Sequence, residues 1–438
     1  MQSKKSKNLK GEITIPGDKS ISHRSVILAS LALGQTVIKG LLKSDDVMKT
    51  IEAMRLFGAE INFKGNETCK INGVGVGGIL EPSQPLDFGN SGTSARLIMG
   101  LVATHPISAI FTGDESLSKR PMQRILEPLK LFGSEVSSRE DNYLPVIIKG
   151  SKLPIPISYK LELPSAQVKS AILLAGLNTP GTTEVIDKFN TRDHTERLLE
   201  IFGCSVDIKE TSQGKKILIN GETDLISTKL EVPGDPSSAA YPIVASIICD
   251  NSSLVVKSVL INPTRDAIFN ILKQMGAKIS FLNKKSLCGE EVYDIKVETS
   301  KLVGIEISEE VAPILIDDYP ILAVAASQAQ GKTRMNGLSE LRFKESNRLD
   351  GIIDLLSKCK VDFNLEGDDL IIFGQDSEKK GGSFIETNLD HRMAMSSLIM
   401  GLVCKNPIEI DNPEIINTSF PNFIKIMQKI GAKIGSSS

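Results

Sequence analysis

Short runs of β-branched residues alternate along the chain with longer segments rich in alanine, leucine and isoleucine. Near the N-terminus, residues 12–15 predict a strand, and the apolar segment that begins at Val26 predicts a helix. Pro16 and Gly17 predict a turn between them. Because helix and strand signals continue to alternate over the 438 residues, the pattern predicts an α/β or α+β protein.

Two helix patterns recur in step along the chain. A helix start with small residues follows a turn six times, marked by Ser20, Ser91, Ser165, Ser237, Asp317 and Asp390, at intervals of 71, 74, 72, 80 and 73 residues. In the second pattern an amphipathic helix ends in glycine, which suits a left-handed C′ position, and a strand follows. Its copies contain Gly58, Gly133, Gly203, Gly276 and Gly431, and a copy without glycine lies at 356–363. The intervals predict six units, grouped as two domains of three.

Composition and charge narrow the class of protein. A hydrophobic content of 41% and a charged content of 24% predict a soluble globular protein of two or three domains. The net charge of −2 argues against a general polyanion binder such as a nucleic-acid-binding protein, although local basic clusters remain possible. There is no apolar run of 18 residues, and the basic N-terminus lacks the apolar core of a secretory signal, so we expect no membrane association.

The cysteines and histidines are scattered. None of the six cysteines forms a C-x-x-C pair, which predicts reduced thiols in a cytoplasmic protein. The four histidines are equally dispersed, so the sequence predicts no metal site.

Candidate chemistry begins at residues 16–24. Ser20 is a plausible N-cap, Lys19 lies beside the helix start, and Arg24 follows one turn later on the same face. A helix N-terminus favours an anion, so this stretch predicts a phosphate or carboxylate pocket. A capped surface helix with two solvated bases is the alternative.

Five further segments place polar groups at or near helix starts. Each alone is compatible with a cap, a solvated loop or an ion-paired surface helix: residues 90–96, 112–122, 165–169 with 191–194, 317–318 with 342–348, and 390–392. The 342–348 segment would place Lys344 and Arg348 on one helix face, with Glu345 between them. The bases that fall at matching ends of the repeats suit a small ligand with several phosphate and carboxylate groups: Lys19, Arg24, Arg120, Lys344, Arg348 and Arg392. The glycine-rich residues 73–78 predict a turn rather than a dinucleotide loop, because prolines follow them.

Five of these motifs, in this order, resemble those of the 5-enolpyruvylshikimate-3-phosphate synthase family: residues 16–24, 89–93, 113–122, 342–348 and 390–395. The resemblance runs essentially end to end. It implies a two-domain inside-out α/β barrel built from six βαβαββ repeats, three in each domain. The N-terminal domain would comprise residues 17–233 and the C-terminal domain residues 1–16 plus 234–438, with the active site in the cleft between them.

The family's reaction transfers the enolpyruvyl group of phosphoenolpyruvate to the 5-hydroxyl of shikimate 3-phosphate and releases phosphate, on the shikimate pathway to chorismate and aromatic amino acids. By resemblance, shikimate 3-phosphate is bound by Lys19, Ser20, Arg24, Ser165, Ala166, Gln167, Arg192, Asp317 and Lys344. Phosphoenolpyruvate is bound by Lys19, Gly92, Arg120, Gln167, Arg348 and Arg392. Asp317 accepts the hydroxyl proton, Glu345 protonates the methylene carbon, and Lys19 completes the catalytic set. The resemblance implies neither metal nor organic cofactor, and a cytoplasmic monomer without nucleic-acid or membrane partners.

Two features resemble the second class of these enzymes. Residues 165–170 and 191–195 match its pattern, and Thr418 stands where the other class has lysine, which leaves one phosphoenolpyruvate contact in doubt. Gly92 leaves room near phosphoenolpyruvate, so we expect no steric block to the inhibitor glyphosate at that position.

Two alternatives remain open from the sequence. The sister enzyme, UDP-N-acetylglucosamine enolpyruvyl transferase, has a loop cysteine that residues 113–120 lack, and asparagine where this chain has Ser20. A non-catalytic anion-binding protein of this fold is the second alternative, and the candidate acid and base, Glu345 and Asp317, count against it.

Overall fold

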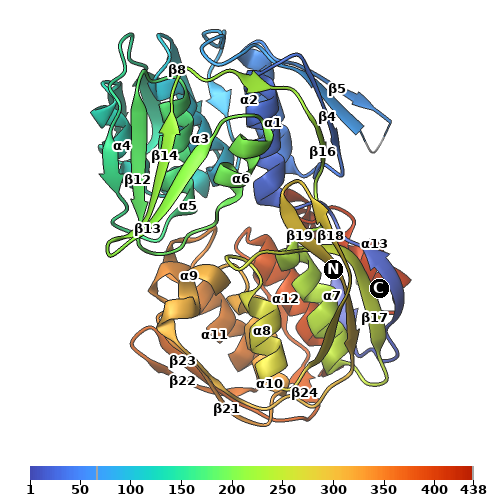
Figure 1. Cartoon of the computed structure of the whole chain (residues 1–438). Coiled ribbons are helices and arrows are strands. Elements are labelled where there is room, and N and C mark those ends of the chain that lie inside the picture. Colours follow the sequence, from blue (N-terminus) through green and yellow to red (C-terminus); the bar gives the residue numbers. More distant parts are fainter. Residues whose placement is uncertain (66–67, 437–438) are drawn as a thin grey trace. The chain divides into compact units, whose positions relative to one another are not determined.

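The computed structural model describes residues 1–65 and 68–436, which form two compact units (Figure 1). Unit 1 comprises residues 1–16, 233–286 and 291–438, and unit 2 comprises residues 17–232 and 287–290. The chain therefore passes between the units beside Pro16 and beside Pro233, and the tip of one hairpin in the second half of the chain belongs to unit 2.

Unit 2 contains three four-stranded sheets among its described residues, and each has the same strand pattern. An edge strand pairs in parallel with its neighbour, and the two remaining strands continue antiparallel. In order across each sheet, the strands are β16 (Lys229–Glu231), β4 (Gln35–Lys39), β6 (Thr68–Asn72) and β5 (Glu60–Lys64); β7 (Leu86–Asp87), β8 (Ser108–Thr112), β10 (Tyr143–Lys149) and β9 (Glu135–Arg139); β11 (Ser158–Lys160), β12 (Thr182–Asp187), β14 (Gly214–Asn220) and β13 (Val206–Thr211).

Unit 1 repeats this arrangement three times within the described residues. Its sheets are β18 (Lys278–Leu287), β19 (Glu290–Glu298), β17 (Ser253–Ile261) and β2 (Lys10–Thr14); β20 (Glu306–Ile307), β21 (Gly331–Met335), β23 (Asp369–Gly374) and β22 (Asp362–Glu366); β25 (Phe384–Ile385), β27 (Ile408–Ile410), β1 (Gln2–Lys4) and β28 (Lys433–Gly435). The N-terminal strands β1 and β2 thus complete two sheets whose other strands come from the second half of the chain.

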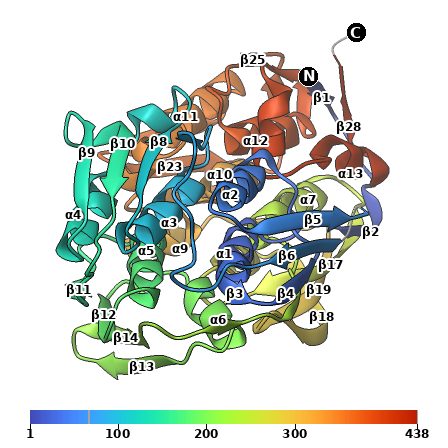
Figure 2. The same ribbon diagram turned by 90° about the horizontal axis from the view of Figure 1, so that it is seen from above.

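Three helices in each unit are buried on nearly every face. They are α1 (Lys19–Leu31), α3 (Gly92–Ala103) and α5 (Ala166–Leu177) in unit 2, and α7 (Pro236–Ile248), α10 (Tyr319–Gln328) and α12 (His391–Gly401) in unit 1. A helix that is apolar all round has no face for solvent and packs inside the domain. Figure 2 shows α1 beside β4 and β6, one instance of a central helix that lies against a sheet.

Six more helices are amphipathic or short, and each precedes a strand. They are α2 (Asp45–Leu56), α4 (Gln123–Leu131), α6 (His194–Ile201), α8 (Ala267–Gln274), α11 (Arg348–Lys358) and α13 (Phe423–Lys429). The predicted C′ glycines are confirmed, since all five have φ between 88° and 103°. The sixth copy keeps the conformation without the glycine, because Lys360 has a φ of 58°. Smaller elements complete the fold: β3 (Ala32–Leu33), β15 (Leu225–Ile226), β24 (Lys379–Gly381), β26 (Cys404–Asn406), α9 (Ala312–Leu315), and the 3₁₀ turns Leu117–Lys119, Glu309–Val311, Ser339–Phe343 and Pro413–Thr418.

Local details of the helix starts differ from the predictions. Asp18, not Ser20, caps α1, because its carboxylate accepts from the Ile21 amide at 2.8 Å. Asp235 caps α7 in the same way, because its carboxylate accepts from the Ser237 and Ser238 amides.

The predicted helix over 342–348 is wrong. The segment is a 3₁₀ turn up to Phe343, and α11 begins only at Arg348. Lys344 and Arg348 therefore do not share a helix face. The glycines at 73–78 lie outside helices and strands, as predicted.

Within the described residues, no helix combines the length and the apolar character that crossing a membrane requires. All six cysteines are free thiols.

Candidate active site

The N-termini of α1, α3 and α5 meet in unit 2. Gln167 on α5 donates to the Thr93 hydroxyl on α3 at 3.0 Å, and its carbonyl oxygen accepts from Arg96 at 2.7 Å. Arg24 on α1 donates to the Ser170 hydroxyl on α5 at 2.7 Å. Because each helix start carries partial positive charge and unpaired amides, three of them side by side favour an anionic ligand.

Arg24 is built into this framework. Its guanidinium is buried, and Nε donates to the Thr195 hydroxyl at 2.7 Å while Nη1 donates to the Ser20 carbonyl at 3.0 Å. With the bond to Ser170, α1, α5 and α6 are joined through one side chain. This arrangement fixes the guanidinium in place before any ligand binds.

Arg120 lies beside the start of α3. Nη2 donates to the Asn90 side-chain carbonyl at 2.5 Å and to the Ser116 hydroxyl at 3.0 Å. Gly92 is the first residue of α3, and a Cβ there would lie 3.3 Å from Arg120 Nη1. Glycine therefore leaves the guanidinium room beside the helix N-terminus.

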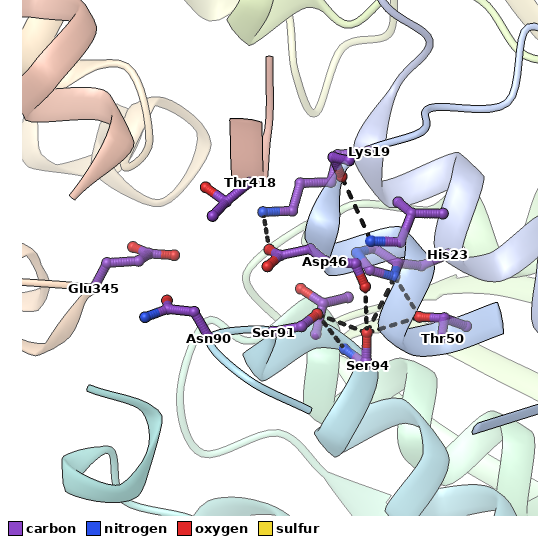
Figure 3. A network of polar contacts seen from close by, with 12 residues as sticks. Lys19, His23, Asp46, Thr50, Asn90, Ser91, Ser94, Glu345 and Thr418 are labelled. Carbon is purple, nitrogen blue, oxygen red and sulfur yellow. Dashed lines mark hydrogen bonds and ion pairs between the residues drawn. The ribbon is translucent and has the colours of Figure 1, made fainter. Parts of the chain in front are cut away.

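Lys19 forms an ion pair with Asp46 at the start of α2 (Figure 3). Behind that pair lie the side chains of His23, Thr50 and Ser94, which contact one another within the core of unit 2. Burial, together with the charges of Lys19 and Arg24, holds the pKa of His23 well below its usual value, so the imidazole is neutral.

Arg192 lies on the loop between β12 and α6, which a buried lysine anchors. Lys169 Nζ forms ion pairs with Asp187 at 3.1 Å and Glu196 at 2.7 Å, and donates to the Thr191 carbonyl at 3.1 Å. Burial alone would lower the pKa of Lys169, but the two carboxylates outweigh it and raise the pKa. The ammonium is therefore charged, and it ties α5, β12 and α6 to the loop.

Arg348 is the centre of a second polar cluster, in unit 1. Its guanidinium is fully buried, and Nε donates to Asp390 at 2.8 Å. Nη1 donates to Asp317 at 3.1 Å, and Nη2 pairs with Glu345. Although burial lowers the pKa of Arg348, the three carboxylates raise it overall, so the charge is permanent. One guanidinium thus holds the candidate base and the candidate acid together.

Arg392, in the first turn of α12, belongs to the same cluster. Its amide donates to Asp390 at 2.9 Å, and Nη1 donates to the Asp317 backbone carbonyl at 2.7 Å. Nη1 also lies 3.3 Å from Asp318, a buried carboxyl whose pKa burial raises. Burial therefore favours the protonated form of Asp318, and the charge of Arg392 opposes it.

Lys344 and Thr418 also belong to unit 1. Burial lowers the pKa of Lys344, and Asp317 counteracts this effect. The Thr418 hydroxyl donates to the Ile415 carbonyl at 2.8 Å, within its own 3₁₀ turn. A hydroxyl held in this way cannot contact groups as far from the backbone as a lysine ammonium could.

One group of possible metal ligands occurs in the described part of the chain. Ligand atoms of Asp193, His194 and Glu290 lie within 4.8 Å of one another. However, Arg197 Nε lies 2.8 Å from Asp193 and 3.5 Å from Glu290, and His194 Nδ1 lies 2.7 Å from Glu290. A guanidinium already neutralises the carboxylates, so the donor set does not fit a metal ion.

The candidate residues thus divide between the two units. Unit 2 holds Lys19, Ser20, Arg24, Gly92, Arg120, Ser165, Ala166, Gln167 and Arg192, and unit 1 holds Asp317, Lys344, Glu345, Arg348 and Arg392. Sequence reasoning missed the partners that fix these groups: Asp46, Asn90, Arg96 and Asp390. Asn90, Arg96 and Asp390 lie inside the quoted motifs. Asp46 lies within a helix-start pattern at residues 44–46, and that pattern was the available signal.

Comparisons with known proteins agree along the whole chain. The sequence pattern of the family described as EPSP synthase (3-phosphoshikimate 1-carboxyvinyltransferase) matches residues 3–427. The 3-phosphoshikimate 1-carboxyvinyltransferase of Bartonella henselae is 49% identical over 436 residues, which cover 99% of this chain and 98% of the relative. That of Parvibaculum lavamentivorans is 47% identical over 425 residues, covering 97% and 94%. A solved structure of EPSP synthase from Acinetobacter baumannii superposes with a TM-score of 0.88 at 40% identity, covering both chains completely.

Proposed function

We infer the roles of individual residues from one premise: the chain belongs to the EPSP synthase (3-phosphoshikimate 1-carboxyvinyltransferase) family. It transfers the enolpyruvyl group of phosphoenolpyruvate to the 5-hydroxyl of shikimate 3-phosphate and releases phosphate, a step of the shikimate pathway to aromatic amino acids. Its substrates are therefore two small polyanions.

We propose that both units contribute to binding these polyanions. In unit 2, shikimate 3-phosphate would contact Lys19, Ser20, Arg24, Ser165, Ala166, Gln167 and Arg192, and phosphoenolpyruvate would contact Lys19, Gly92, Arg120 and Gln167. In unit 1, Asp317 and Lys344 would contact the first substrate, and Arg348 and Arg392 the second. The supporting observation in unit 2 is the meeting of three helix N-termini with fixed guanidinium groups, which offsets the repulsion between two anions.

The chemical step needs a base for the 5-hydroxyl and an acid for the methylene carbon of the enol. We propose Asp317 as the base and Glu345 as the acid. The observation that carries this proposal is their shared partner, because Arg348 bonds to both carboxylates. Two carboxylates on one guanidinium lie close enough to act on one bound pair of substrates.

Carboxamide variants test these roles. Positioned acid–base groups contribute about 10²- to 10⁴-fold to rate, so Asp317→Asn and Glu345→Gln should each lower kcat at least about 100-fold in a phosphate-release assay. Glu345→Gln should also abolish incorporation of deuterium at C3 of phosphoenolpyruvate in D₂O. Glu414→Gln changes an exposed carboxylate of unit 1 and serves as the control. A kcat within two-fold of the wild type in either site variant would remove that residue's role.

Several finer assignments complete the proposal. We propose second-class membership, supported by residues 165–170 and 191–195, and a glyphosate-accessible site, supported by Gly92. We also propose that each unit is one domain and that its sheets and central helices form an inside-out α/β barrel of three repeats, supported by the repeated strand pattern. We propose a cytoplasmic location, supported by the six free thiols. We also propose a monomer, which light scattering of the eluted protein tests.

A further inference from the structure

A chain of buried polar groups connects α1, α2 and α3 behind Lys19 (Figure 3). His23 Nδ1 lies 2.7 Å from the Thr50 hydroxyl, which lies 2.7 Å from the Ser94 hydroxyl. Ser94 Oγ lies 2.6 Å from the Ser91 hydroxyl and donates to the Asp46 backbone carbonyl at 3.1 Å. The side chains of this chain are inaccessible to solvent, so their hydrogen bonds must be satisfied within the protein.

The order of the protons follows from what each group can accept. The Asp46 carbonyl only accepts, so Ser94 donates to it. With Ser94 as donor to the carbonyl, we assign the hydroxyls of Ser91 and Thr50 as donors to Ser94. His23 Nδ1, which lies 2.7 Å from Thr50 Oγ1 and 3.4 Å from Ser94 Oγ, then donates to the Thr50 hydroxyl. His23 Nε2 has no partner in the structure, and an unpaired lone pair there costs less than an unpaired N–H would. This order assigns the Nδ1–H tautomer to the imidazole.

The chain ends at two groups of the candidate site. Ser94 holds the backbone of Asp46, whose carboxylate pairs with Lys19. Ser91 is the N-cap of α3, and Gly92 follows it as the first helical residue. The position of the ammonium and that of the α3 amides thus depend on the same hydroxyls.

We propose that His23 and Thr50 are positioning residues for the phosphoenolpyruvate half of the reaction, acting through Ser94 on Lys19 and on the start of α3. The proposal rests on the proposed function, which assigns Gly92 to phosphoenolpyruvate alone and Lys19 to both substrates. Because His23 stays neutral, the order of the protons does not change over the pH range of an ordinary assay.

Thr50→Val tests the proposal, since valine keeps the shape of threonine but can neither donate nor accept a hydrogen bond. One lost hydrogen bond is equivalent to about 2- to 10-fold in binding, so we expect KM for phosphoenolpyruvate to rise about 5-fold. KM for shikimate 3-phosphate should rise less than KM for phosphoenolpyruvate, because Lys19 is assigned to both substrates but the start of α3 only to phosphoenolpyruvate. Thr50→Ser restores the hydroxyl and should return both constants to within about 2-fold of the wild type.

Thr179→Val is the matched control. Thr179 is a fully buried threonine of unit 2 whose hydroxyl donates to the Ala175 carbonyl at 2.9 Å, outside this chain of groups. It should leave both KM values unchanged. Equal increases of both KM values in Thr50→Val, or equal behaviour of the valine and serine variants, would overturn the proposal, because a merely structural role predicts them.

Two further measurements separate the possible failures. With ¹⁵N-labelled histidine, the His23 signals should report the Nδ1–H tautomer, and the Nε2–H tautomer would overturn the assigned order of protons. Lys19→Met should raise KM for phosphoenolpyruvate more than Thr50→Val does. If Lys19→Met leaves that KM unchanged, the proposed function of Lys19 fails; if only Thr50→Val leaves it unchanged, the positioning proposal fails alone.

Discussion

Replacing Gly92 by alanine should weaken phosphoenolpyruvate binding without destabilising the protein. The new Cβ would lie 3.3 Å from Arg120 Nη1 and 3.4 Å from both Arg96 Nη1 and Leu117 Cδ1. Ordinary contacts of this kind are about 3.5–4.0 Å, so the Arg120 guanidinium must shift by about 0.3 Å. Since a misplacement of about 1 Å costs about 100-fold, a shift of about 0.3 Å corresponds to a loss of about 4-fold. We expect this loss as a rise in KM for phosphoenolpyruvate.

The fold itself should tolerate this change. Gly92 is the first residue of α3 and its backbone does not require glycine, so alanine gains up to about 1 kcal/mol in helix preference, which offsets the close contact. The melting temperature should therefore stay within about 2 °C of the wild type. A phosphate-release assay at saturating shikimate 3-phosphate measures KM for phosphoenolpyruvate, and thermal unfolding monitored by circular dichroism measures stability.

Gly435→Ala is the matched control, because a Cβ at Gly435 meets no atom within 4 Å. KM for phosphoenolpyruvate should be unchanged in this variant. An unchanged KM in Gly92→Ala, or an equal increase of KM for both substrates, would refute the argument that the methyl group acts through Arg120.

Two further predictions concern stability. Burial lowers the pKa of His105 to about 4, so between pH 6.5 and about 4 the unfolded chain binds a proton that the native protein does not, and stability falls as the pH falls. In urea unfolding, His105→Gln should reduce this dependence of stability on pH by up to about 1.4 kcal/mol per pH unit. The same pH dependence in the variant and the wild type would contradict the prediction. Lys360 and Gly431 both have a left-handed backbone, which suits glycine. Lys360→Gly should therefore raise the free energy of unfolding by about 1 kcal/mol, and Gly431→Ala should lower it by a similar amount. A change of the opposite sign in either variant would show that side-chain contacts dominate at these helix ends.

The repeating architecture was predictable from sequence because its signals are local. A left-handed residue after each amphipathic helix must be compatible with positive φ, and glycine recurs there at Gly58, Gly133, Gly203, Gly276 and Gly431. The copy without glycine shows the limit of such signals, since Lys360 adopts the same conformation where sequence preference alone would not place it.

The candidate site was only partly predictable, because its partners lie far apart in sequence. Asp46 pairs with Lys19 from another helix, and no local pattern indicates which carboxylate will meet that ammonium. The wrong helix at 342–348 has a similar cause. An i,i+4 spacing of Lys344 and Arg348 predicts a shared face, but bonds to Asp317 and Asp390 from distant segments fix Arg348 at the start of α11 instead.

The proposed assignment requires Glu345 to change from an ion-pair partner of Arg348 to an acid. Before substrate binds, the Arg348 guanidinium pairs with Glu345. On the proposed assignment, the carboxylate of phosphoenolpyruvate takes a place on the same guanidinium. Glu345 then loses part of its cationic partner and faces an added negative charge, and both changes favour the protonated carboxyl. On this assignment, binding of the substrate that must be protonated would load the acid that protonates it, and the bond from Arg348 to Asp390 would keep the guanidinium in place.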